Sequence, residues 1–338
     1  MSGCDHASDG SLAPAREVGA GPAGPAREVG IGAGAVAVVR GGAIAPGSAA
    51  LLGVTMFFWG TAFRATDIGS RHASPIVFST LRALPATLAL LVAMAVTGSR
   101  LPRGRRMLAL GVLTGLLTVS LTFEGIAEAT KLAGPGNAAV LTNVAPFFAV
   151  LFARAMFGTP TARTTIGGLV LGFSGVVVMV SSQLGGGSIG NLALGAAIAL
   201  VTAAGFAAGA LIVGHAATRD PDLDMLGFTT LQYIVGSLAL VVATAIHGHP
   251  GTTDWGSPAL AGSVAWVALG SSATASICFN LALRRIPAAR ATAWQFLAPV
   301  VAVAVEAVLG NAPGIVTIAG MALAIAGVAI VSMARSTS

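Results

Sequence analysis

The sequence predicts an all-α integral membrane protein with ten transmembrane helices, arranged as two inverted five-helix repeats. Composition is the first observation behind this fold class. The 338 residues are 55% hydrophobic and only 9% charged, with a mean hydropathy of +0.87. Since a soluble domain carries roughly 25% charged residues, polar side chains are too few here to cover a water-soluble globule. The other two observations are ten successive apolar stretches and an internal repeat.

The repeat is clearest between residues 78–95 and residues 228–245, which are identical at nine of eighteen positions. Two further regions keep an offset of 152 or 153 positions between partners. The matching pairs there are Ala138/Ala291, Ala145/Ala298, Pro146/Pro299, Ala149/Ala302, Val150/Val303, Thr165/Thr317, Ile166/Ile318, Gly168/Gly320, Leu171/Leu323, Gly175/Gly327 and Val176/Val328. A hydrophobic chain that repeats itself indicates two halves built alike, with any binding site lying between them.

Residues 1–47 are rich in glycine, alanine and proline and contain PAREVG twice, at 14–19 and 25–30. Such a composition cannot bury enough apolar surface to order itself. The segment also lacks the basic start, apolar core and cleavage site of a secretory signal. We expect a disordered cytoplasmic tail or, alternatively, a stretch that precedes the true start codon.

After this tail come ten stretches close to the ~20 apolar residues that a helix needs to cross a bilayer. They are 48–67, 74–97, 106–128, 135–157, 164–183, 190–213, 225–247, 258–282, 289–309 and 313–333. The uncharged run 164–218 is too long for one span and breaks at the Gly-Gly-Gly-Ser sequence 185–188. This break separates a first repeat at 48–183 from a second at 190–334. Continuous hydrophobicity favours helices over the alternating strands of a barrel.

Arginine placement predicts the topology. The connections after the fifth, seventh and ninth spans contain no Lys or Arg, whereas the connections on the opposite side are rich in arginine. Arg71 and Lys131 are the only Arg or Lys residues in connections on the arginine-poor side. The arginines of the arginine-rich side are Arg100, Arg103, Arg105, Arg106, Arg163, Arg219, Arg284, Arg285, Arg290 and Arg335. Because basic connections stay in the cytoplasm, we expect both termini there. Five helices per repeat is an odd number, so the second repeat must enter the membrane inverted, which lets a central site face alternate sides.

The basic composition does not indicate nucleic-acid binding, although the net charge is +6. The arginines lie in short interhelical turns rather than on one face, so they serve orientation. Seventeen arginines against one lysine, with abundant alanine and glycine, fit a GC-rich bacterial genome. The expected location is therefore the inner (plasma) membrane of a bacterium. Cys4 and Cys278 form neither a disulfide framework nor a metal motif.

Several short motifs occur in a familiar order. They are Phe58-Trp59-Gly60, Ser74-Pro75 with Leu81-Arg82, the run from Ala133-Gly134 to Ala145-Pro146, then Ala282 to Arg290, Phe296 to Val303, and glycine-rich helices at 167–180 and 319–332. On these motifs, residues 48–334 resemble EamA-type members of the drug/metabolite transporter superfamily. The resemblance implies export of small metabolites, amino acids or drugs, driven by an ion gradient or by exchange.

The chain departs from the pattern of that family at two places. Leu-Gly-Glu often follows the fourth and ninth helices in the family. Here those places read Phe157-Gly158-Thr159 and Leu309-Gly310-Asn311. Both glutamates are missing, so no role is carried over from them.

Charged residues inside the spans are the first candidates for a substrate or ion site, because charge within a bilayer is costly. Arg82 lies about 12 Å along the second span at 1.5 Å per residue, and Arg64 and Glu124 are expected in the same outer layer. This cluster could hold a carboxylate-bearing substrate or exchange a proton; the alternative is a structural ion pair that locks helices together. The repeat partners of Arg82 and Glu124 are Gln232 and Ile277. The fold therefore does not demand the charge, which favours function.

The fourth and ninth spans supply a second candidate site. Pro146 and Pro299 are expected to break these helices and to leave the carbonyls of Thr142 and Gln295 without their usual partners. Asn143, Trp294 and Gln295 cluster beside the breaks; the alternative is an ordinary packing kink. Trp59 in the first span either stacks on substrate or fills space.

Four other charged positions are also candidates for structural roles. Glu128 and Lys131 are spaced i, i+3 and are expected to pair at the membrane surface. Glu306 either snorkels to the interface or faces the cavity as a proton site, and Arg154 is expected to be a snorkelling anchor.

No serine–histidine–aspartate grouping, metal-ligand cluster or phosphate-binding loop is recognisable, so we expect no enzyme activity, cofactor or metal. The function predicted is a secondary active transporter that exports a small molecule by alternating access across the lipid bilayer, coupled to protons or to a counter-substrate. The alternatives are a non-transporting scaffold or receptor subunit that retained the fold, and an importer of the same architecture.

Overall fold

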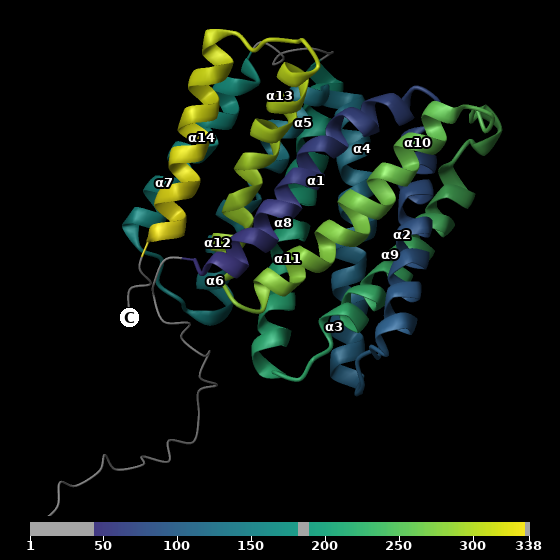
Figure 1. The fold of residues 1–338 in the computed structure, drawn as a ribbon, viewed down its shortest axis with the longest axis horizontal. Helices are drawn as coiled ribbons and strands as arrows, with labels where there is room; N and C mark the ends of the chain where they lie inside the picture. The colour runs from purple at the N-terminus through teal and green to yellow at the C-terminus, as the bar shows by residue number, and fades with distance from the viewer. Residues whose placement is uncertain (1–43, 182–188, 335–338) are drawn as a thin grey trace, which may run out of the picture. The chain divides into compact units, whose positions relative to one another are not determined.

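The computed structural model describes residues 44–181 and 189–334. All regular elements in these ranges are helices (Figure 1). The all-α fold class predicted from composition is therefore confirmed. The predicted tail lies outside the described residues apart from 44–47, and so does the predicted break at 185–188.

The first half contains five successive helical units. They are α1 (Pro46–Ser70), α2 (Pro75–Thr97), the run of α3 (Arg105–Gly115), η1 (Leu116–Ser120) and α4 (Leu121–Ala133), the pair α5 (Pro135–Thr142) and α6 (Ala145–Phe157), and α7 (Arg163–Met179). The second half follows the same plan. It contains α8 (Ile189–Arg219), α9 (Met225–His247), a short η3 (Pro250–Thr252), the run of α10 (Pro258–Trp266), η4 (Val267–Thr274) and α11 (Ala275–Leu283), the run of α12 (Ala288–Ala293), η5 (Trp294–Phe296) and α13 (Leu297–Val308), and α14 (Ile315–Met333).

Nine of these helical units are long and apolar enough to cross a membrane in the part of the chain described. The remaining one, α7, has 17 residues and corresponds to the predicted fifth span. At 1.5 Å per residue it is about 26 Å long, slightly less than the ~30 Å thickness of the hydrocarbon layer. Nine predicted spans are thus confirmed, and the count of ten stays a prediction.

Local sequence explains where many helices begin and end. Proline occupies the first or second position of α1, α2, α5, α6 and α10, where its missing N–H has no helical partner to lose. Gly98 ends α2 and Gly158 ends α6, both with positive φ angles (69° and 65°) that glycine adopts without strain.

The equivalent helices of the two halves pack antiparallel to each other. Between α2 and α9, the hydroxyls of Thr80 and Thr244 lie 2.6 Å apart, and those of Thr87 and Ser237 lie 2.7 Å apart. Residue numbers therefore rise along one helix as they fall along the other. Thr87 and Ser237 are partners in the sequence repeat, so the symmetry axis that relates the halves passes between them.

The helices α7 and α14 form the second antiparallel pair, and glycines bring their backbones together. A Cβ atom on Gly175 would overlap the backbone of Gly320 and Ala324, and one on Gly168 would crowd Gly327. The two contacts are equivalent, because Gly168 corresponds to Gly320 and Gly175 to Gly327 in the sequence repeat. Small residues at such positions permit the close backbone approach that stabilises helix pairs in lipid.

The remaining contacts are also reciprocal. The first helix α1 packs along α10, η4 and α11, and its counterpart α8 packs along α3, η1 and α4. The fold is therefore a pair of inverted repeats whose helices interlock, as the sequence predicts.

Two groups of connections mark the opposite ends of the helices. At one end, which we call the Arg100 end, the backbone N–H of Arg100 donates to Asp224 at 2.9 Å and joins the connections 98–104 and 220–224. At the other, the Glu306 end, the N–H of Asp254 donates to the carbonyl of His72 at 2.9 Å and joins 71–74 to 248–257. The connections 98–104 and 251–254 thus lie at opposite ends, as the predicted topology requires.

Gly327→Ala should weaken the pairing of α7 with α14, since the new methyl group would overlap the backbone of Gly172. Overpacking of this kind costs about 1–3 kcal/mol and should lower the Tm. Gly167→Ala is the matched control, because a Cβ there meets open space. The tight contact would be refuted by equal Tm values for the two variants.

Asp224 should make stability depend on pH. Burial opposes ionisation of its carboxyl group, but hydrogen bonds from the N–H groups of Gly227 and Arg100 prevail and hold its pKa below the usual 3.8. Its contribution is therefore complete above about pH 4 and is lost as the pH falls through the lower, folded-state pKa. Asp224→Ala should cost about 0.5–2 kcal/mol near neutral pH as the cap of α9 is lost.

This loss should shrink below about pH 4, where the wild-type carboxylate is itself being protonated. Thermal unfolding at several pH values measures the difference between wild type and variant. Asp222→Ala, at an exposed position in the same connection, serves as the control and should change neither Tm nor its pH dependence. A similar loss in the control would contradict the assignment to Asp224.

Candidate binding site between the two halves

The third helical unit of each half contains a π-helical segment. These segments are η1 at Leu116–Ser120 and η4 at Val267–Thr274, which overlap when the repeats are aligned. A π turn shifts side chains out of the regular helical pattern and occurs frequently at functional sites. In η4 it presents Ser271 and Ser272 toward α2.

Arg82 on α2 is held by these serines. Its Nε donates to Ser272 Oγ at 3.2 Å, and Nη2 donates to Ser271 Oγ at 2.9 Å. The guanidinium carbon lies 3.9 Å from the ring centroid of Phe123 on α4, a cation–π geometry. Both halves of the protein thus contribute to one cationic site. The ion pairs found among the described residues do not include Arg82, so neutral groups surround its charge.

Trp59 supports this arrangement from α1. Its Nε1 donates to the carbonyl of Ser271 at 3.2 Å, which fixes one of the serines that hold Arg82. The indole also packs on Phe206 and Phe279, with ring centroids 5.8 and 5.2 Å away. Trp59 therefore fills space and orients Ser271.

A buried polar network continues from the same serines. The hydroxyl of Tyr233 on α9 donates to the carbonyl of Ser272 at 2.9 Å and lies 2.7 Å from Ser276 Oγ. One turn away, Nδ2 of Asn280 donates to Gln232 Oε1 at 2.8 Å and lies 2.9 Å from Thr229 Oγ1. The Nε2 of Gln232 is buried without a hydrogen-bond partner. The Oε1 of Gln232 is therefore satisfied, whereas both N–H donors of its Nε2 lack a partner.

The fourth and ninth helical units are interrupted beside the two prolines. The first breaks between α5 and α6, and Asn143 lies in the break. Its Nδ2 donates to the carbonyl of Ala139 at 2.7 Å, but its Oδ1 is buried without a partner. In the second, the 3₁₀ segment η5 precedes Pro299, and Oε1 of Gln295 is likewise buried and unpartnered. Each break therefore carries one buried acceptor that lacks a donor.

The side chain of Trp294 in η5 contacts α14. Its Nε1 donates to Ser332 Oγ at 3.1 Å and ties the ninth unit to α14. The ring packs between two apolar clusters, one around α6 and α8 and the other around α14. This contact is structural.

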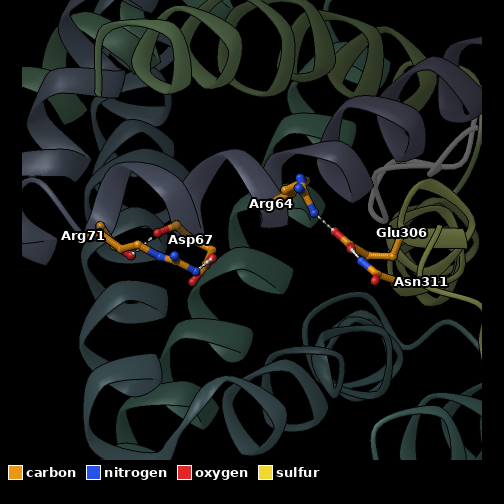
Figure 2. Close-up of polar contacts among 6 residues, drawn as sticks. Arg64, Asp67, Arg71, Glu306 and Asn311 are labelled. Carbon is orange, nitrogen blue, oxygen red and sulfur yellow. Dashed lines mark hydrogen bonds and ion pairs between the residues drawn. The ribbon is translucent and has the colours of Figure 1, made fainter. Parts of the chain in front are cut away.

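The structure does not join Arg64, Arg82 and Glu124 into one cluster. Arg64 Nη1 instead contacts Glu306 Oε1 at 2.6 Å, and Asn311 Nδ2 donates to the other oxygen of Glu306 at 2.8 Å (Figure 2). Figure 2 also shows Arg71, the C-cap residue of α1, paired with Asp67. Arg71 Nη2 lies 2.6 Å from Asp67 Oδ2. Glu124 is partly buried and takes part in none of the ion pairs found in the described ranges.

The remaining charged candidates for structural roles form a local pair or are exposed. Lys131 Nζ lies 3.8 Å from Glu128 Oε2, so the predicted i, i+3 pair is confirmed. Arg154 is exposed on α6. Within the described ranges, no group of three or more histidine, cysteine, aspartate or glutamate side chains could hold a metal ion.

Sequence reasoning missed several of the residues that surround Arg82. Ser271, Ser272 and Ser276 form a run of small hydroxyls inside an apolar span, and Tyr233 is the only tyrosine of the chain. These two signals could have marked the site. The pairing of Arg64 with Glu306 offered no such signal, because the partners are 242 positions apart.

Comparison with known proteins agrees with this fold. The model of the EamA-like transporter family matches residues 47–181 and again residues 194–333. The uncharacterized inner membrane transporter YedA of Escherichia coli is 28% identical over 256 residues, 75% of this chain and 79% of that protein. A probable terminal-alkyne amino-acid exporter of Streptantibioticus cattleyicolor is 28% identical over 287 residues, 82% of this chain and 91% of that protein.

A solved crystal structure shares the fold, with a TM-score of 0.72 over 84% of this chain and 95% of that one, at 18% sequence identity. The two family matches together span most of the sequence. The chain belongs to the EamA-like transporter family. It is a multi-pass membrane protein and a membrane transporter, as the sequence motifs imply.

The two glutamines near the site should respond differently to substitution by methionine. Gln295→Met removes an unpartnered oxygen, so the free energy of unfolding should fall by less than about 0.5 kcal/mol or rise. Gln232→Met takes an acceptor from Asn280 and should cost about 1–3 kcal/mol. Thermal unfolding of the purified variants without added ligand compares them. A larger loss at Gln295 would show that its oxygen has a partner.

Proposed function

We propose that this protein is a secondary active transporter that exports small carboxylate-bearing metabolites by alternating access. The observation that carries the proposal is Arg82, a cation surrounded by neutral groups at the interface of the two halves. Charge within a membrane protein marks a substrate or ion pathway unless a structural partner neutralises it. The serines and Phe123 hold the guanidinium in place but leave its charge available to an anion.

A carboxylate suits this site. A guanidinium presents several N–H donors that match the two oxygens of a carboxylate. The contacts with Ser271 and Ser272 use Nε and Nη2, which leaves Nη1 without a described contact. Because such charge-assisted hydrogen bonds are stronger than neutral ones, they would select acids over neutral analogues.

The unpartnered acceptors Asn143 Oδ1 and Gln295 Oε1 suit a donor group such as a substrate ammonium. An amino acid or a similar zwitterion has a carboxylate that suits Arg82 and an ammonium group that suits these acceptors. The similarity to an amino-acid exporter supports this substrate class. Trp59 serves the site through Ser271, and Pro146 and Pro299 serve it by breaking the helices that carry the two acceptors.

The geometry of the halves supports the mechanism. Two inverted repeats, which we place at 48–183 and 190–334, can exchange conformations so that a site between them faces either side. The sequence contains no recognisable ATP-hydrolysing motif, so a proton gradient or a counter-substrate would supply the energy. The arginine-rich connections favour a cytoplasmic location for the Arg100 end and for both termini. Similarity to an inner membrane transporter supports a bacterial inner-membrane location.

Arg82→Met should abolish carboxylate recognition without destabilising the fold, because an apolar side chain of similar length replaces a charge that has no counter-ion. The purified protein, reconstituted into vesicles, is assayed for counterflow of radiolabelled amino acids and of their amide analogues. Loss of one or two charge-assisted hydrogen bonds should lower acid flux about 10- to 100-fold. The wild type should prefer acid over amide, and the variant should not.

Arg154→Met is the matched control, since it removes an exposed arginine from a span and should leave flux unchanged. Equal loss of flux in both variants would refute a special role for Arg82. Failure of the wild type to transport any metabolite would favour a non-transporting scaffold or receptor subunit. Net flux in vesicles of known orientation separates export from import.

A further inference from the structure

The two ends of the protein are packed differently, although the repeat would make them alike. At the Arg100 end, α6 packs on α12, and α8 packs on both α11 and α12. One apolar cluster joins the start of α1 to these four helices, with Ala149, Ala282 and Ala291 fully buried in it. This end is closed.

The repeat counterparts of these contacts lie at the Glu306 end. The counterparts of α6 and α12 are α13 and α5, and those of α8 and α11 are α1 and α4. Among the described residues, α5 and α13 do not form a packed pair comparable to α6 and α12. Similarly, α1 does not pack on α4 or α5 in the way that α8 packs on α11 and α12. The cluster found there contains Ala129, Ala138 and Ala199, from α4, α5 and α8, without α1 or α13.

Burial shows the same imbalance. In the most apolar window of each helix, 33% of α1 is buried against 56% of α8, and 28% of the α3–α4 unit against 50% of the α10–α11 unit. Equivalent helices would be equally buried if the halves adopted the same conformation. This difference in burial parallels the uneven packing of the two ends, as expected for one of two related states.

We infer that in the opposite state the Glu306 end closes, with Arg64 leaving Glu306 and pairing with Glu124. This inference rests on the proposed alternating-access function and names the residues that switch. In the described state Arg64 and Glu306 link α1 to α13, with 48% and 36% of their side chains exposed. In the other state α1 moves against α4 and α5, and α5 against α13.

Repeat alignment selects Glu124 as the new partner. The helix α1 ends at Ser70 and α8 ends at Arg219, so Val213 of α8 lies level with Arg64 of α1. The counterpart of Glu124 is Ile277 of α11. Val213 belongs to the apolar cluster of the closed end, and Ile277 packs against the same cluster. When the Glu306 end closes in the same way, Arg64 and Glu124 are brought together.

The exchange has a physical advantage. An arginine enclosed by moving helices without a counter-ion would incur a large desolvation cost. Transfer of Arg64 from one glutamate to another keeps its charge paired in both states. The two states then differ little in electrostatic energy, and substrate binding can shift the balance between them.

Two chemically identical substitutions test the exchange. Both native cysteines are first replaced, by Cys4→Ser and Cys278→Ser. Spin labels are then attached at Asn137→Cys on α5 and at Val308→Cys on α13. The distance between the two labels is measured in the reconstituted protein. Glu306→Gln removes the partner of the described state and should increase the short-distance population about three- to fivefold. Glu124→Gln removes the partner of the opposite state and should decrease it by a similar factor.

Glu128→Gln is the matched control, because Glu128 lies one turn beyond Glu124 on α4 and pairs with Lys131. It should leave the distances unchanged. In an Arg64→Met background neither glutamate substitution should have an effect. Shifts of the same sign for Glu306→Gln and Glu124→Gln, or shifts that persist without Arg64, would overturn the inference.

Amino-acid counterflow of the same labelled proteins separates this inference from the proposed function. Distances that change with added amino acid but not with either glutamate substitution would overturn the partner exchange and leave transport standing. Absence of counterflow in the labelled wild type, together with the expected opposite shifts, would instead count against the proposed function and support the exchange.

Discussion

The antiparallel contact between equivalent helices is the interaction on which the rest of the structure depends. In lipid no hydrophobic force drives helices together, so close packing and hydrogen bonds must do so. The chain meets this requirement with glycines between α7 and α14 and with hydroxyls between α2 and α9, where Thr87 meets its own repeat partner Ser237. These contacts lie on or around the symmetry axis. They hold the two halves together.

The proposed function depends on the places where the two halves are not equivalent. At corresponding positions of α2 and α9, one half presents Arg82 and the other Gln232, and both meet polar groups of the third unit of the second half. The packing is equally uneven, with one end closed by an apolar cluster and the other joined through Arg64 and Glu306. In the proposed mechanism, the symmetric repeats allow two related conformations, and the residues that differ between the repeats form a single polar site.

Much of the fold was predictable because the bilayer restricts it to few solutions. Apolar runs long enough to cross hydrocarbon must be helices, and the repeat required the second half to be inverted. The candidate site was predictable only in part. Arg82, Gln232 and Asn143 stood out as polar residues within apolar spans. Ser271 and Ser272 did not, since serine is common in membrane helices and only the π segment turns both toward Arg82.

The sequence by itself therefore determined the fold class, the helix boundaries to within a few residues and the inverted relation of the halves. These follow from hydrophobic length, from proline and glycine at helix ends, and from the repeat, all of which are local or periodic signals. Only the tertiary structure decided that Arg64 pairs with Glu306 rather than with Glu124, and that Arg82 faces serines rather than a carboxylate. The physical reason is that each of these partnerships depends on how two distant helices are rotated and shifted against each other, and side-chain packing across the whole interface sets that geometry.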